Sequence, residues 1–422
     1  MSVTCKVPEL RFGEFSGEWE SVKLERLGSF QGGGTPRTTE KEYWIGKIPW
    51  ISSSDINDDD IKNINVTRYI NETAIKESAT KLIPKGSVLF VSRVGVGKLA
   101  IANVDLCTSQ DFANLTLKNV NSQYIAYYFL ANKTLLIRYS QGTSIKGFTT
   151  NDIKTLKLNL PSKPEQEKIA LFLSSVDSRI AQLTKKEQLL REYKKGVMQK
   201  IFSQELRFHP KGISSQAQGT DDDGSEFPEW VEKKLGDIGI TYNGLTGKTS
   251  ENFGSGKPYI QYKQIFDNAR ISVNGFGYVF IEPNEKQNKA QFGDIFFTTS
   301  SETPNEVGFA SVLLDDIKEV YLNSFCFGYR VKLLDILNPY FAKFLFRSAN
   351  FRRKVIKLAQ GSTRYNISKI ALMKIFIQLP SLEEQTKIAN FLSSLDTKIE
   401  QVNKELNLTK EFKKALLQQM FV

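Results

Sequence analysis

The sequence is poor in histidine and cysteine. Its 422 residues include one histidine, His209, and three cysteines, Cys5, Cys107 and Cys326, which lie far apart along the chain. Ser-His-Asp triads need an imidazole, and zinc sites need clustered histidine or cysteine ligands. The sequence therefore excludes both kinds of site, and its scattered cysteines predict reduced thiols in the core rather than a disulfide framework.

Long apolar runs are also missing. A membrane-spanning helix needs about 18 consecutive apolar residues, and the sequence contains no such run. The segment Met1–Leu10 has one lysine and no apolar stretch behind it, which argues against a signal peptide. We expect a cytoplasmic protein without membrane contact.

Positive charge, in contrast, is abundant. The chain carries 57 Lys and Arg against 46 Asp and Glu, a formal net charge of +11. Such an excess favours a polyanionic partner, nucleic acid rather than a membrane surface. The length predicts two to four domains, and 29 Phe with 15 Tyr indicate folded, aromatic-rich cores.

Catalytic motifs are not recognisable. Gly95-Val-Gly97-Lys98 lacks the first glycine and the Ser or Thr of a phosphate-binding loop, so we interpret it as a turn with a basic residue. Asp55–Asp60 lacks the glycine and the bidentate Glu of a calcium loop. A Rossmann glycine fingerprint and the Asn/Asp-Pro-Pro-aromatic tetrapeptide of amino-methyltransferases are absent too. A nuclease with a carboxylate-bound metal stays open as an enzymatic alternative, although no carboxylate pair has a spacing that singles it out.

A long internal repeat organises the chain. Leu160-Pro-Ser-Lys-Pro-Glu-Gln-Glu-Lys-Ile-Ala-Leu-Phe-Leu-Ser-Ser-Val-Asp177 returns as Leu379-Pro-Ser-Leu-Glu-Glu-Gln-Thr-Lys-Ile-Ala-Asn-Phe-Leu-Ser-Ser-Leu-Asp396, at an offset of 219 residues. Weaker matches place Trp19 opposite Trp230, and the tetrapeptide Glu-Leu-Arg-Phe at 9–12 returns at 205–208. The chain is therefore two copies of one module, each with a variable part and a preserved segment.

The preserved segments have the pattern of long helices. Apolar residues advance by alternating steps of four and three from Ile169 to Ile201, and again from Ile388 to Met420, with one lysine interruption in each, at Lys194 and Lys413. A helix of about 37 residues would be roughly 55 Å long. The simplest way to bury both stripes is to pack the two copies together. The alternative is two unrelated amphipathic helices that each cap their own domain.

The variable parts have a different pattern. Runs such as Ser87–Ser92 and Asp294–Thr299 predict buried strands, and apolar helical stretches follow at 124–139 and 340–356. We predict mixed α/β domains at 12–158 and 222–378, helical segments at 159–205 and 379–422, and an exposed linker at 206–221.

Together these residues resemble the specificity (S, HsdS-type) subunits of type I restriction–modification systems. The duplicated Leu-Pro-x-x-x-Glu-Gln-x-Lys-Ile-Ala-x-Phe-Leu segment is similar to the start of that family's conserved helical regions. The Gly33-Gly-Thr-Pro36 turn, Gln141-Gly-Thr143 and Gln360-Gly-Ser362 resemble parts of its target-recognition domains. The second copy has Gly244-Leu-Thr-Gly247 at the turn, which leaves open whether the two turns share one geometry.

The resemblance implies a fold, a function and partners. The fold would be two mixed α/β target-recognition domains separated by two long antiparallel coiled-coil helices with a pseudo-twofold repeat. The subunit, in a bacterium or archaeon, would have no catalytic activity and would recognise a bipartite, asymmetric sequence in double-stranded DNA. It would direct two methyltransferase (M) and two restriction (R) subunits there. S-adenosylmethionine, ATP and Mg would be bound by those partners, so no cofactor or metal is expected in this chain. Alternatives are the specificity component of a related type II-like methyltransferase/nuclease, or a coiled-coil scaffold that binds polyanions.

DNA contacts are expected from Lys, Arg and glycine-rich turns at phosphates, and from polar side chains at base edges. In the first domain the candidates are Thr35, Arg37, Ser92, Arg93, Lys98, Thr143, Ser144 and Lys146. In the second domain they are Thr246, Lys248, Lys263, Ser300, Ser362, Thr363 and Arg364. The alternative for any single member is a solvated surface residue or a turn former.

Overall fold

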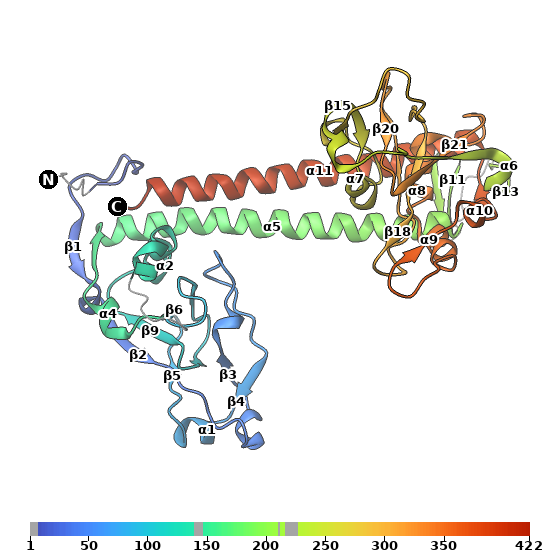
Figure 1. The fold of residues 1–422 in the computed structure, drawn as a ribbon. Coiled ribbons are helices and arrows are strands. Elements are labelled where there is room, and N and C mark those ends of the chain that lie inside the picture. The colour runs from blue at the N-terminus through green and yellow to red at the C-terminus, as the bar shows by residue number, and fades with distance from the viewer. Residues whose placement is uncertain (1–6, 139–146, 210–211, 216–226) are drawn as a thin grey trace. The chain divides into compact units, whose positions relative to one another are not determined.

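The chain folds into two compact units, called here unit 1 and unit 2. The structure, a computed structural model, describes residues 7–138, 147–209, 212–215 and 227–422. Unit 1 comprises Met1–Lys185 and Asn403–Val422, and unit 2 comprises Lys186–Val402. Both boundaries fall inside a long helix, so each unit contains one globular part together with a stretch of both long helices (Figure 1).

Unit 1 is a mixed α/β domain, as predicted. One four-stranded antiparallel sheet has the order β2-β9-β6-β7, a second has the order β4-β3-β8-β5, and β1 pairs with β10. The strands are β1 (Glu20–Lys23), β2 (Gly28–Gly32), β3 (Ile48–Ile51), β4 (Arg68–Ile70), β5 (Leu82–Ile83), β6 (Val88–Val91), β7 (Leu99–Ile101), β8 (Leu106–Thr108), β9 (Phe112–Leu117) and β10 (Lys157–Leu160). The helices are α1 (Glu72–Lys76), α2 (Ser122–Ala131), α3 (Lys133–Arg138), α4 (Thr150–Lys154) and the beginning of α5 (Lys163–Phe202).

Unit 2 repeats this architecture. Its main sheet has the order β14-β21-β17-β19, a second sheet has the order β16-β15-β20, and β13 pairs with β23. The strands are β11 (Leu206–His209), β12 (Gly212–Ser215), β13 (Val231–Lys234), β14 (Gly239–Asn243), β15 (Phe253–Ile260), β16 (Gly277–Val279), β17 (Ile295–Thr298), β18 (Ser300–Ser301), β19 (Ala310–Val312), β20 (Tyr321–Leu322), β21 (Cys326–Val331), β22 (Tyr365–Asn366) and β23 (Phe376–Leu379). The helices are α6 (Leu235–Ile238), α7 (Tyr262–Asp267), α8 (Pro339–Leu345), α9 (Ala349–Ile356), α10 (Lys369–Leu372) and most of α11 (Leu382–Gln419).

The strand registers show that the two globular parts are copies. Glu20 pairs with Leu160 in unit 1, and their repeat counterparts Val231 and Leu379 pair in unit 2. Each second sheet also contains one parallel pair, β3 with β8 and β15 with β20. The repeat in the sequence is therefore a repeat of topology, although few residues of the variable parts are identical.

Buried strands at the centre of each main sheet explain the predicted apolar runs. All four residues of β6 and all four of β17 are buried. Each strand follows a glycine at φ +86°, Gly86 or Gly293, a left-handed conformation that residues with a side chain rarely adopt. Helix α2 covers the first sheet through Phe129, which packs edge-on against Phe90 of β6. Cys107 and Cys326 are buried core residues without disulfides, as expected, and burial raises the pKa of Cys107 to about 11.

The two glycine turns share one geometry. A Cβ atom on Gly33 would lie 2.1 Å from the Ser109 carbonyl oxygen, and one on Gly244 would lie 2.1 Å from that of Asn323. The next residues, Gly34 and Leu245, each donate a backbone hydrogen bond to the end of a strand, at 2.8 Å and 2.7 Å. The first glycine is therefore required in both copies. In unit 1 the second glycine is required too, because a Cβ atom on Gly34 would lie 2.5 Å from the Ala79 carbonyl carbon, whereas unit 2 has Leu245 at this position.

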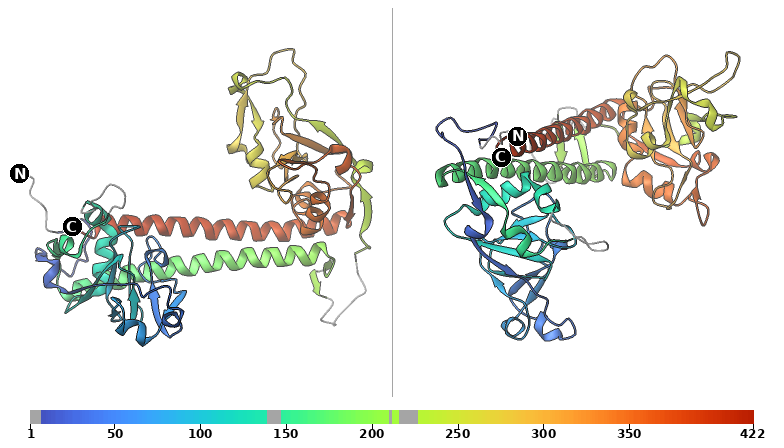
Figure 2. Two further views of the ribbon diagram at one scale, coloured as in Figure 1. Left: turned by 60° about the horizontal axis from the view of Figure 1, so that its bottom comes forward. Right: turned by 60° about the vertical axis from the view of Figure 1, so that its left-hand side comes forward.

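The long helices are confirmed. Helix α5 has 40 residues and α11 has 38. In each unit they lie side by side and run antiparallel (Figure 2), since within unit 1 Asp177 contacts Lys413 whereas Arg179, further along α5, contacts the earlier Glu405. Most predicted stripe residues are buried, from Ile169 to Ile201 in α5 and from Ile388 to Met420 in α11. The two stripes therefore face each other instead of capping separate domains.

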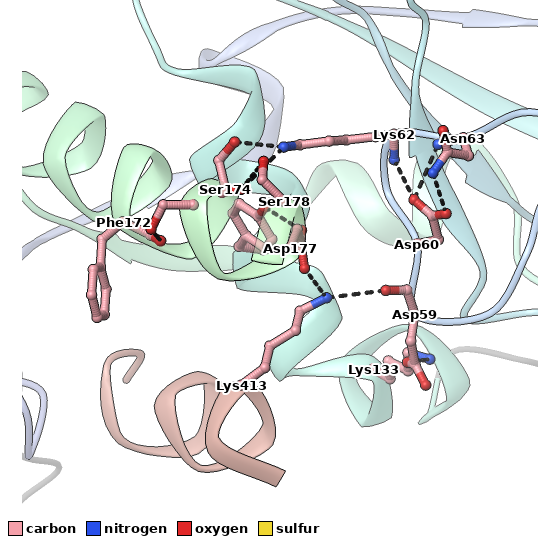
Figure 3. Close-up of polar contacts among 12 residues, drawn as sticks. Asp59, Asp60, Lys62, Asn63, Lys133, Phe172, Ser174, Asp177, Ser178 and Lys413 are labelled. Carbon is pink, nitrogen blue, oxygen red and sulfur yellow. Dashed lines mark hydrogen bonds and ion pairs between the residues drawn. The ribbon is translucent and has the colours of Figure 1, made fainter. Parts of the chain in front are cut away.

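The lysine interruptions form equivalent ion pairs. In unit 1, Lys413 of α11 contacts Asp177 of α5 at 2.7 Å and donates to the Asp59 carbonyl oxygen at 3.1 Å (Figure 3). In unit 2, Lys194 of α5 contacts Asp396 of α11. Lys194 and Asp396 are the repeat counterparts of Lys413 and Asp177. A lysine within an apolar stripe is a device that fixes helix register, here by pairing with a carboxylate across the seam.

The repeated Glu-Gln dipeptide joins each long helix to its globular part. Gln166 donates to the Pro161 carbonyl oxygen at 2.9 Å and accepts a hydrogen bond from the Asn121 amide, at the start of α2, at 3.2 Å. Gln385 makes the same two bonds, to Pro380 at 2.9 Å and from Asn338 at 2.8 Å. The motif is preserved because it fixes how the helix leaves the domain.

The repeated Glu-Leu-Arg-Phe tetrapeptide completes this junction. Arg11 forms a two-pronged ion pair with buried Glu165, with N–O distances of 2.7 Å and 2.8 Å. Arg207 reaches the counterpart Glu384 at 3.0 Å. Since Phe208 is buried against Phe391, the first residues of the predicted linker 206–221 belong to the packed fold, and 206–209 pair with 212–215 as strands β11 and β12. Composition alone was misleading here, because the segment's polar residues hide this packing.

Candidate nucleic-acid interface

In unit 1 the turn between β6 and β7 is held by two other segments. The Ser92 amide donates to the Asp111 carbonyl oxygen at 2.7 Å, and the Ser92 carbonyl oxygen accepts from the Phe148 amide at 3.0 Å. Arg93 forms a β-bridge with Gly147. Ser92 is thus a buried anchor, and Arg93 is exposed. The candidates Thr143, Ser144 and Lys146 lie outside the described residues.

The tip of this turn has an unusual backbone. Val94 has φ +49°, and Gly95 and Gly97 have φ +108° and +100°. A left-handed conformation is unfavourable for a β-branched residue such as Val94. The Val94 side chain is also 61% exposed, so it gains little from burial. Lys98 folds back, and its ammonium group donates to the Ile56 carbonyl oxygen at 3.3 Å. The turn therefore presents Arg93 and Val94 to solvent and keeps Lys98 at its base, which confirms that Gly95–Lys98 forms a turn.

Thr35 contacts the loop 109–111, which also holds Ser92. Its hydroxyl donates to Gln110 Oε1 at 2.5 Å, and Gln110 precedes the Asp111 that binds Ser92. Thr35 and the nearby Arg37 are both exposed. The loop 109–111 thus brings together candidates that are far apart in the sequence.

In unit 2 the equivalent turn is held in the same way. Ser300 pairs with Asn366, and the Ile367 amide donates to the Thr299 carbonyl oxygen at 3.0 Å, as Phe148 does to Ser92 in unit 1. Tyr262 also donates to the Ser300 carbonyl oxygen, at 2.6 Å. The turn after the central strand therefore meets the loop before the last short helix in both units.

That second loop is a closed, exposed turn. Gln360 and Asn366 bond each other's backbone at 3.0 Å and 2.8 Å. Gly361 has φ +122°, and a Cβ atom there would lie 2.1 Å from the Arg364 carbonyl oxygen. The side chains between them that face solvent are the three candidates Ser362, Thr363 and Arg364.

Sequence reasoning missed two arginines that hold the loop after β18. Arg352 is 8% exposed and donates to the carbonyl oxygens of Asn305, Val307 and Gly308 at 2.7–2.9 Å. Arg347 donates to the Ala310 carbonyl oxygen at 2.6 Å, and both guanidinium groups lie over the Phe309 ring. Burial lowers the pKa of each arginine to about 10, so both stay charged at neutral pH. The basic run Arg352-Arg353-Lys354 is the one signal in the sequence that could have indicated Arg352, and Arg347 has no such signal.

The remaining candidates of unit 2 have partners within the unit. The Thr246 amide donates to Gln287 at 3.1 Å. Lys248 contacts Glu285, its side chain is only 7% exposed, and its hydrogen bond lowers the pKa of Glu285 to about 2. Lys263 is 82% exposed and contacts Asp267 at 2.8 Å. Lys248 is therefore already neutralised within the domain, whereas Lys263 reaches solvent.

Metal clusters, membrane spans and cavities are the other features that bear on function. Within the described ranges, no cluster of three or more His, Cys, Asp or Glu residues could hold a metal ion. The helices that the structure describes include none long and apolar enough to cross a membrane. An apolar cavity of about 650 Å³ in unit 2 is lined by Trp230, Phe351 and Phe376 among others, and lysines such as Lys354 border it.

Comparison with known proteins agrees with the repeat. The family model described as "Type I restriction modification DNA specificity domain" matches twice, at residues 16–191 and 228–410. The MjaIX specificity subunit of a type I restriction enzyme from Methanocaldococcus jannaschii is 28% identical over 97% of this chain and 94% of its own length. The EcoR124I/EcoR124II specificity subunit of Escherichia coli is 30% identical over 47% of this chain and 50% of its own.

A solved structure has the same fold. The type I restriction–modification S subunit from M. genitalium superposes with a TM-score of 0.58 at 17% identity, over 99% of both chains. The two matches of the family model cover most of the chain, and each includes one globular part and much of the long helix that follows it. This chain therefore belongs to the family of type I restriction–modification DNA specificity subunits, which recognise DNA and are not themselves catalytic.

Proposed function

We propose that each unit reads one half of a split, asymmetric target in double-stranded DNA. The observation that carries this proposal is a pair of equivalent two-loop surfaces, one in each unit. Each consists of the turn after the central strand, which begins at Ser92 or Thr299, and the loop before the last short helix, which contains Phe148 or Ile367. The same backbone contacts, Phe148 to Ser92 and Ile367 to Thr299, present different side chains, Arg93 and Val94 in one unit and Ser362, Thr363 and Arg364 in the other. Equal scaffolds with unequal side chains suit two different half-sites.

The chemistry of these loops fits duplex DNA. An exposed arginine can bind a guanine edge or a phosphate, and hydroxyl groups can reach base edges or phosphates. Backbone hydrogen bonds at Ser92 in one unit and between Gln360 and Asn366 in the other hold the bases of the loops, which lowers the ordering cost on binding. The net charge of +11 supports affinity for the phosphate backbone.

The partners follow from the repeated helices. We propose that two M subunits and two R subunits assemble with this chain in the cytoplasm. S-adenosylmethionine, ATP and Mg would be bound by those subunits. The preserved helical segments support two copies of each partner, because each repeat offers the same residues.

Mapping of methylated bases tests the proposal. The chain is co-expressed with its M subunit, and the methylated genomic sites of the wild type are compared with those of Arg93→Ala and Arg364→Ala. Each variant should lower affinity about tenfold, the cost of one arginine–base pair, and relax the sequence preference in a different half of the site. Arg270→Ala, an exposed arginine already paired with Asp315 at 2.9 Å, is the matched control and should change neither half.

Several outcomes would contradict it. If both arginine variants relaxed the same half-site, the units would not read separate halves. Metal-dependent cleavage by the repurified lone chain would support the nuclease alternative instead. Binding to duplex DNA with no preferred sequence at any salt concentration would favour a polyanion-binding scaffold.

A further inference from the structure

The loop between β20 and β21 of unit 2 exposes a phenylalanine. Phe325 is 66% exposed and lies where the chain passes from the second sheet of the unit to its main sheet. Single exposed apolar residues are ordinary on protein surfaces. Phe325 is notable for its place, because its carbonyl oxygen accepts a hydrogen bond from the Thr299 amide at 3.0 Å. It therefore borders the turn that forms one half of the two-loop surface of unit 2.

The backbone of this loop is held from several sides. The Phe325 amide donates to Asn323 Oδ1 at 2.8 Å, and the Asn323 amide donates to the Ile260 carbonyl oxygen at 3.0 Å. Gly244 lies so close that a Cβ atom there would be 2.1 Å from the Asn323 carbonyl oxygen. The Phe325 side chain thus reaches solvent from a fixed backbone, so little backbone freedom would be lost on binding.

Unit 1 has the same loop with a different residue at this position. In the loop 109–111, the Asp111 carbonyl oxygen accepts from the Ser92 amide at 2.7 Å, and the Asp111 amide donates to Ser109 Oγ at 3.3 Å. Phe325 makes the equivalent two bonds in unit 2. Asp111 is half-buried, whereas Phe325 is exposed. One backbone scaffold therefore carries a carboxylate in one unit and an aromatic ring in the other.

The phenylalanine ring fits one feature of duplex DNA. It has no hydrogen-bond donor or acceptor, so it can read a base only through apolar contact, and the apolar group in the major groove is the thymine C5-methyl. The exposed residues Ser324, Ser362 and Arg364 of the neighbouring loops are polar. Such surroundings suit a DNA surface better than a protein interface, which would bury a continuous apolar patch.

We propose that Phe325 reads a thymine methyl group in the half-site of unit 2. The proposal rests on the proposed function and adds to it the base feature that is recognised and the side chain that recognises it. The unit 2 half-site then contains an A·T pair whose methyl group lies against the ring. Insertion of the ring between base pairs as a wedge fits less well, because part of Phe325 is covered by its own domain and the ring does not project freely.

Deoxyuridine substitution tests the proposal, because uracil differs from thymine only in lacking the methyl group. The full chain is purified with its M subunit, and the target found by methylation mapping is placed in a synthetic duplex, called here the mapped duplex. Arg364→Ala identifies which half belongs to unit 2. Each thymine of both halves is then replaced singly by deoxyuridine. Fluorescence anisotropy measures the affinity of the wild type and of Phe325→Ala for every duplex.

The chain offers matched controls. Phe376→Ala removes another exposed phenylalanine of unit 2, which is 47% exposed on β23 and lines the apolar cavity rather than the two-loop surface. Phe325→Leu keeps an apolar side chain at the same position. Because Phe325 is exposed, its variants should fold, and circular dichroism melting checks this. Phe325→Asp, which carries the residue of unit 1 on the same backbone, replaces the alanine variant if that variant fails to fold.

One thymine of the unit 2 half-site should respond to deoxyuridine. Its replacement should lower the affinity of the wild type about fourfold, as expected for one methyl group removed from an apolar contact. Phe325→Ala should bind the mapped duplex about tenfold more weakly and should no longer respond to deoxyuridine, since the two changes remove the same contact. Phe325→Leu should keep part of the response. Phe376→Ala should behave as the wild type.

Three results would overturn the proposal. The first is a wild type with equal affinity for thymine and deoxyuridine at every position of the unit 2 half-site. The second is a folded Phe325→Ala that keeps the full response to deoxyuridine, because another residue would then contact the methyl group. The third is a duplex bend, measured by fluorescence energy transfer, that Phe325→Ala removes without any methyl response, which would identify a wedge.

The same measurements separate this proposal from the proposed function. A wild type that prefers the mapped duplex over unrelated DNA but does not respond to deoxyuridine refutes only the role of Phe325. A wild type without preference for the mapped duplex refutes the proposed function, and the role of Phe325 with it. Thymines of the unit 1 half-site should give the same result in every variant, since unit 1 has Asp111 at this position.

Discussion

The two units have the same junctions with the long helices and different loops. At each junction a buried glutamate, Glu165 or Glu384, binds the arginine of a Glu-Leu-Arg-Phe segment, and a glutamine accepts a hydrogen bond from the backbone amide of the asparagine that caps α2 or α8. At the loops, unit 2 fixes the chain after β18 with Arg352, whereas unit 1 makes a short turn with Val94 at its tip. The junctions must match two similar helices, while the loops are free to follow different DNA sequences.

The two junctions differ in whether the nearby tryptophan bonds the buried glutamate. In unit 2, Trp230 donates to Glu384 at 3.2 Å in addition to the arginine. In unit 1, Trp19 Nε1 is buried and has no hydrogen-bond partner among the described residues, and Arg11 alone forms the close two-pronged pair with Glu165. One glutamate therefore serves two donors and the other serves one.

The largest effect is expected from removing these glutamates. Glu384→Gln should lower the stability of unit 2 by about 3 kcal/mol, because it weakens a buried ion pair and the Trp230 hydrogen bond. Glu165→Gln should cost unit 1 about 2 kcal/mol, because Arg11 loses its charged partner but keeps its bonds to the Ser16 and Gly17 carbonyl oxygens, and no tryptophan bond is affected. Hydrogen–deuterium exchange resolves each unit separately. Equal losses in both units would show that the tryptophan bond contributes nothing.

Replacing Lys413 should lower stability more than replacing Lys194, because the carboxylate partner of Lys194 keeps a second lysine. Lys413→Met leaves Asp177 with Tyr127 as its hydrogen-bond donor and should cost about 2 kcal/mol. Lys194→Met leaves Asp396 still paired with Lys343 at 2.9 Å, so about 1 kcal/mol is expected. Denaturant unfolding of the two variants under identical conditions measures the difference. A larger loss for Lys194→Met would contradict this account of the seam.

Arg352, which fixes the loop after β18, should affect DNA recognition through its hydrogen bonds rather than through its charge. Arg352→Lys keeps the positive charge but cannot bond three carbonyl groups in a fixed fork, so affinity for the mapped duplex should fall about tenfold. The salt dependence of binding should stay unchanged, and only the half-site of unit 2 should lose sequence preference. Arg353→Lys, its exposed neighbour on α9, is the control. A relaxed preference in both half-sites would rule out a local positioning role.

The smallest effect is expected at Lys248. Lys248→Met should change DNA affinity less than twofold, because the ammonium group is already bound by Glu285. The pKa of Glu285 should rise from about 2 toward its ordinary value of 4.5. A carboxyl group with a lowered pKa stabilises the fold above its unfolded pKa and loses this contribution as the pH falls toward 2. An NMR titration of the Glu285 carboxyl carbon measures the shift, and an unchanged pKa would contradict the pairing.

Much of the architecture could be predicted because the chain repeats itself. The stripes from Ile169 and from Ile388 predicted two long helices, and the runs after Gly86 and Gly293 predicted buried strands. The roles of Gln166 and Arg11 could not be predicted, since their partners are 45 and 154 residues away along the chain. The strands at 206–215 were missed because polar composition hid a packed phenylalanine, Phe208.

The candidate site shows the same division. Residue type and glycine-rich turns pointed to Arg93, Ser300 and Arg364, which the fold places in the two-loop surfaces. The same reasoning also selected Lys248, whose charge is neutralised by Glu285, and it overlooked Arg352 because a buried arginine bound to carbonyl groups has no local signature. Residue type predicts what a side chain can bind, and only packing determines whether it is free to do so.

The sequence by itself determined the duplicated module, the long helices and the positive charge, because periodicity, internal repetition and composition are local properties of the chain. Tertiary structure decided which residues meet across the junctions, which cations are neutralised and which loops lie together. Those outcomes depend on contacts between distant segments, such as Ser92 with Phe148 and Lys413 with Asp177, whose geometry is set only when the core packs.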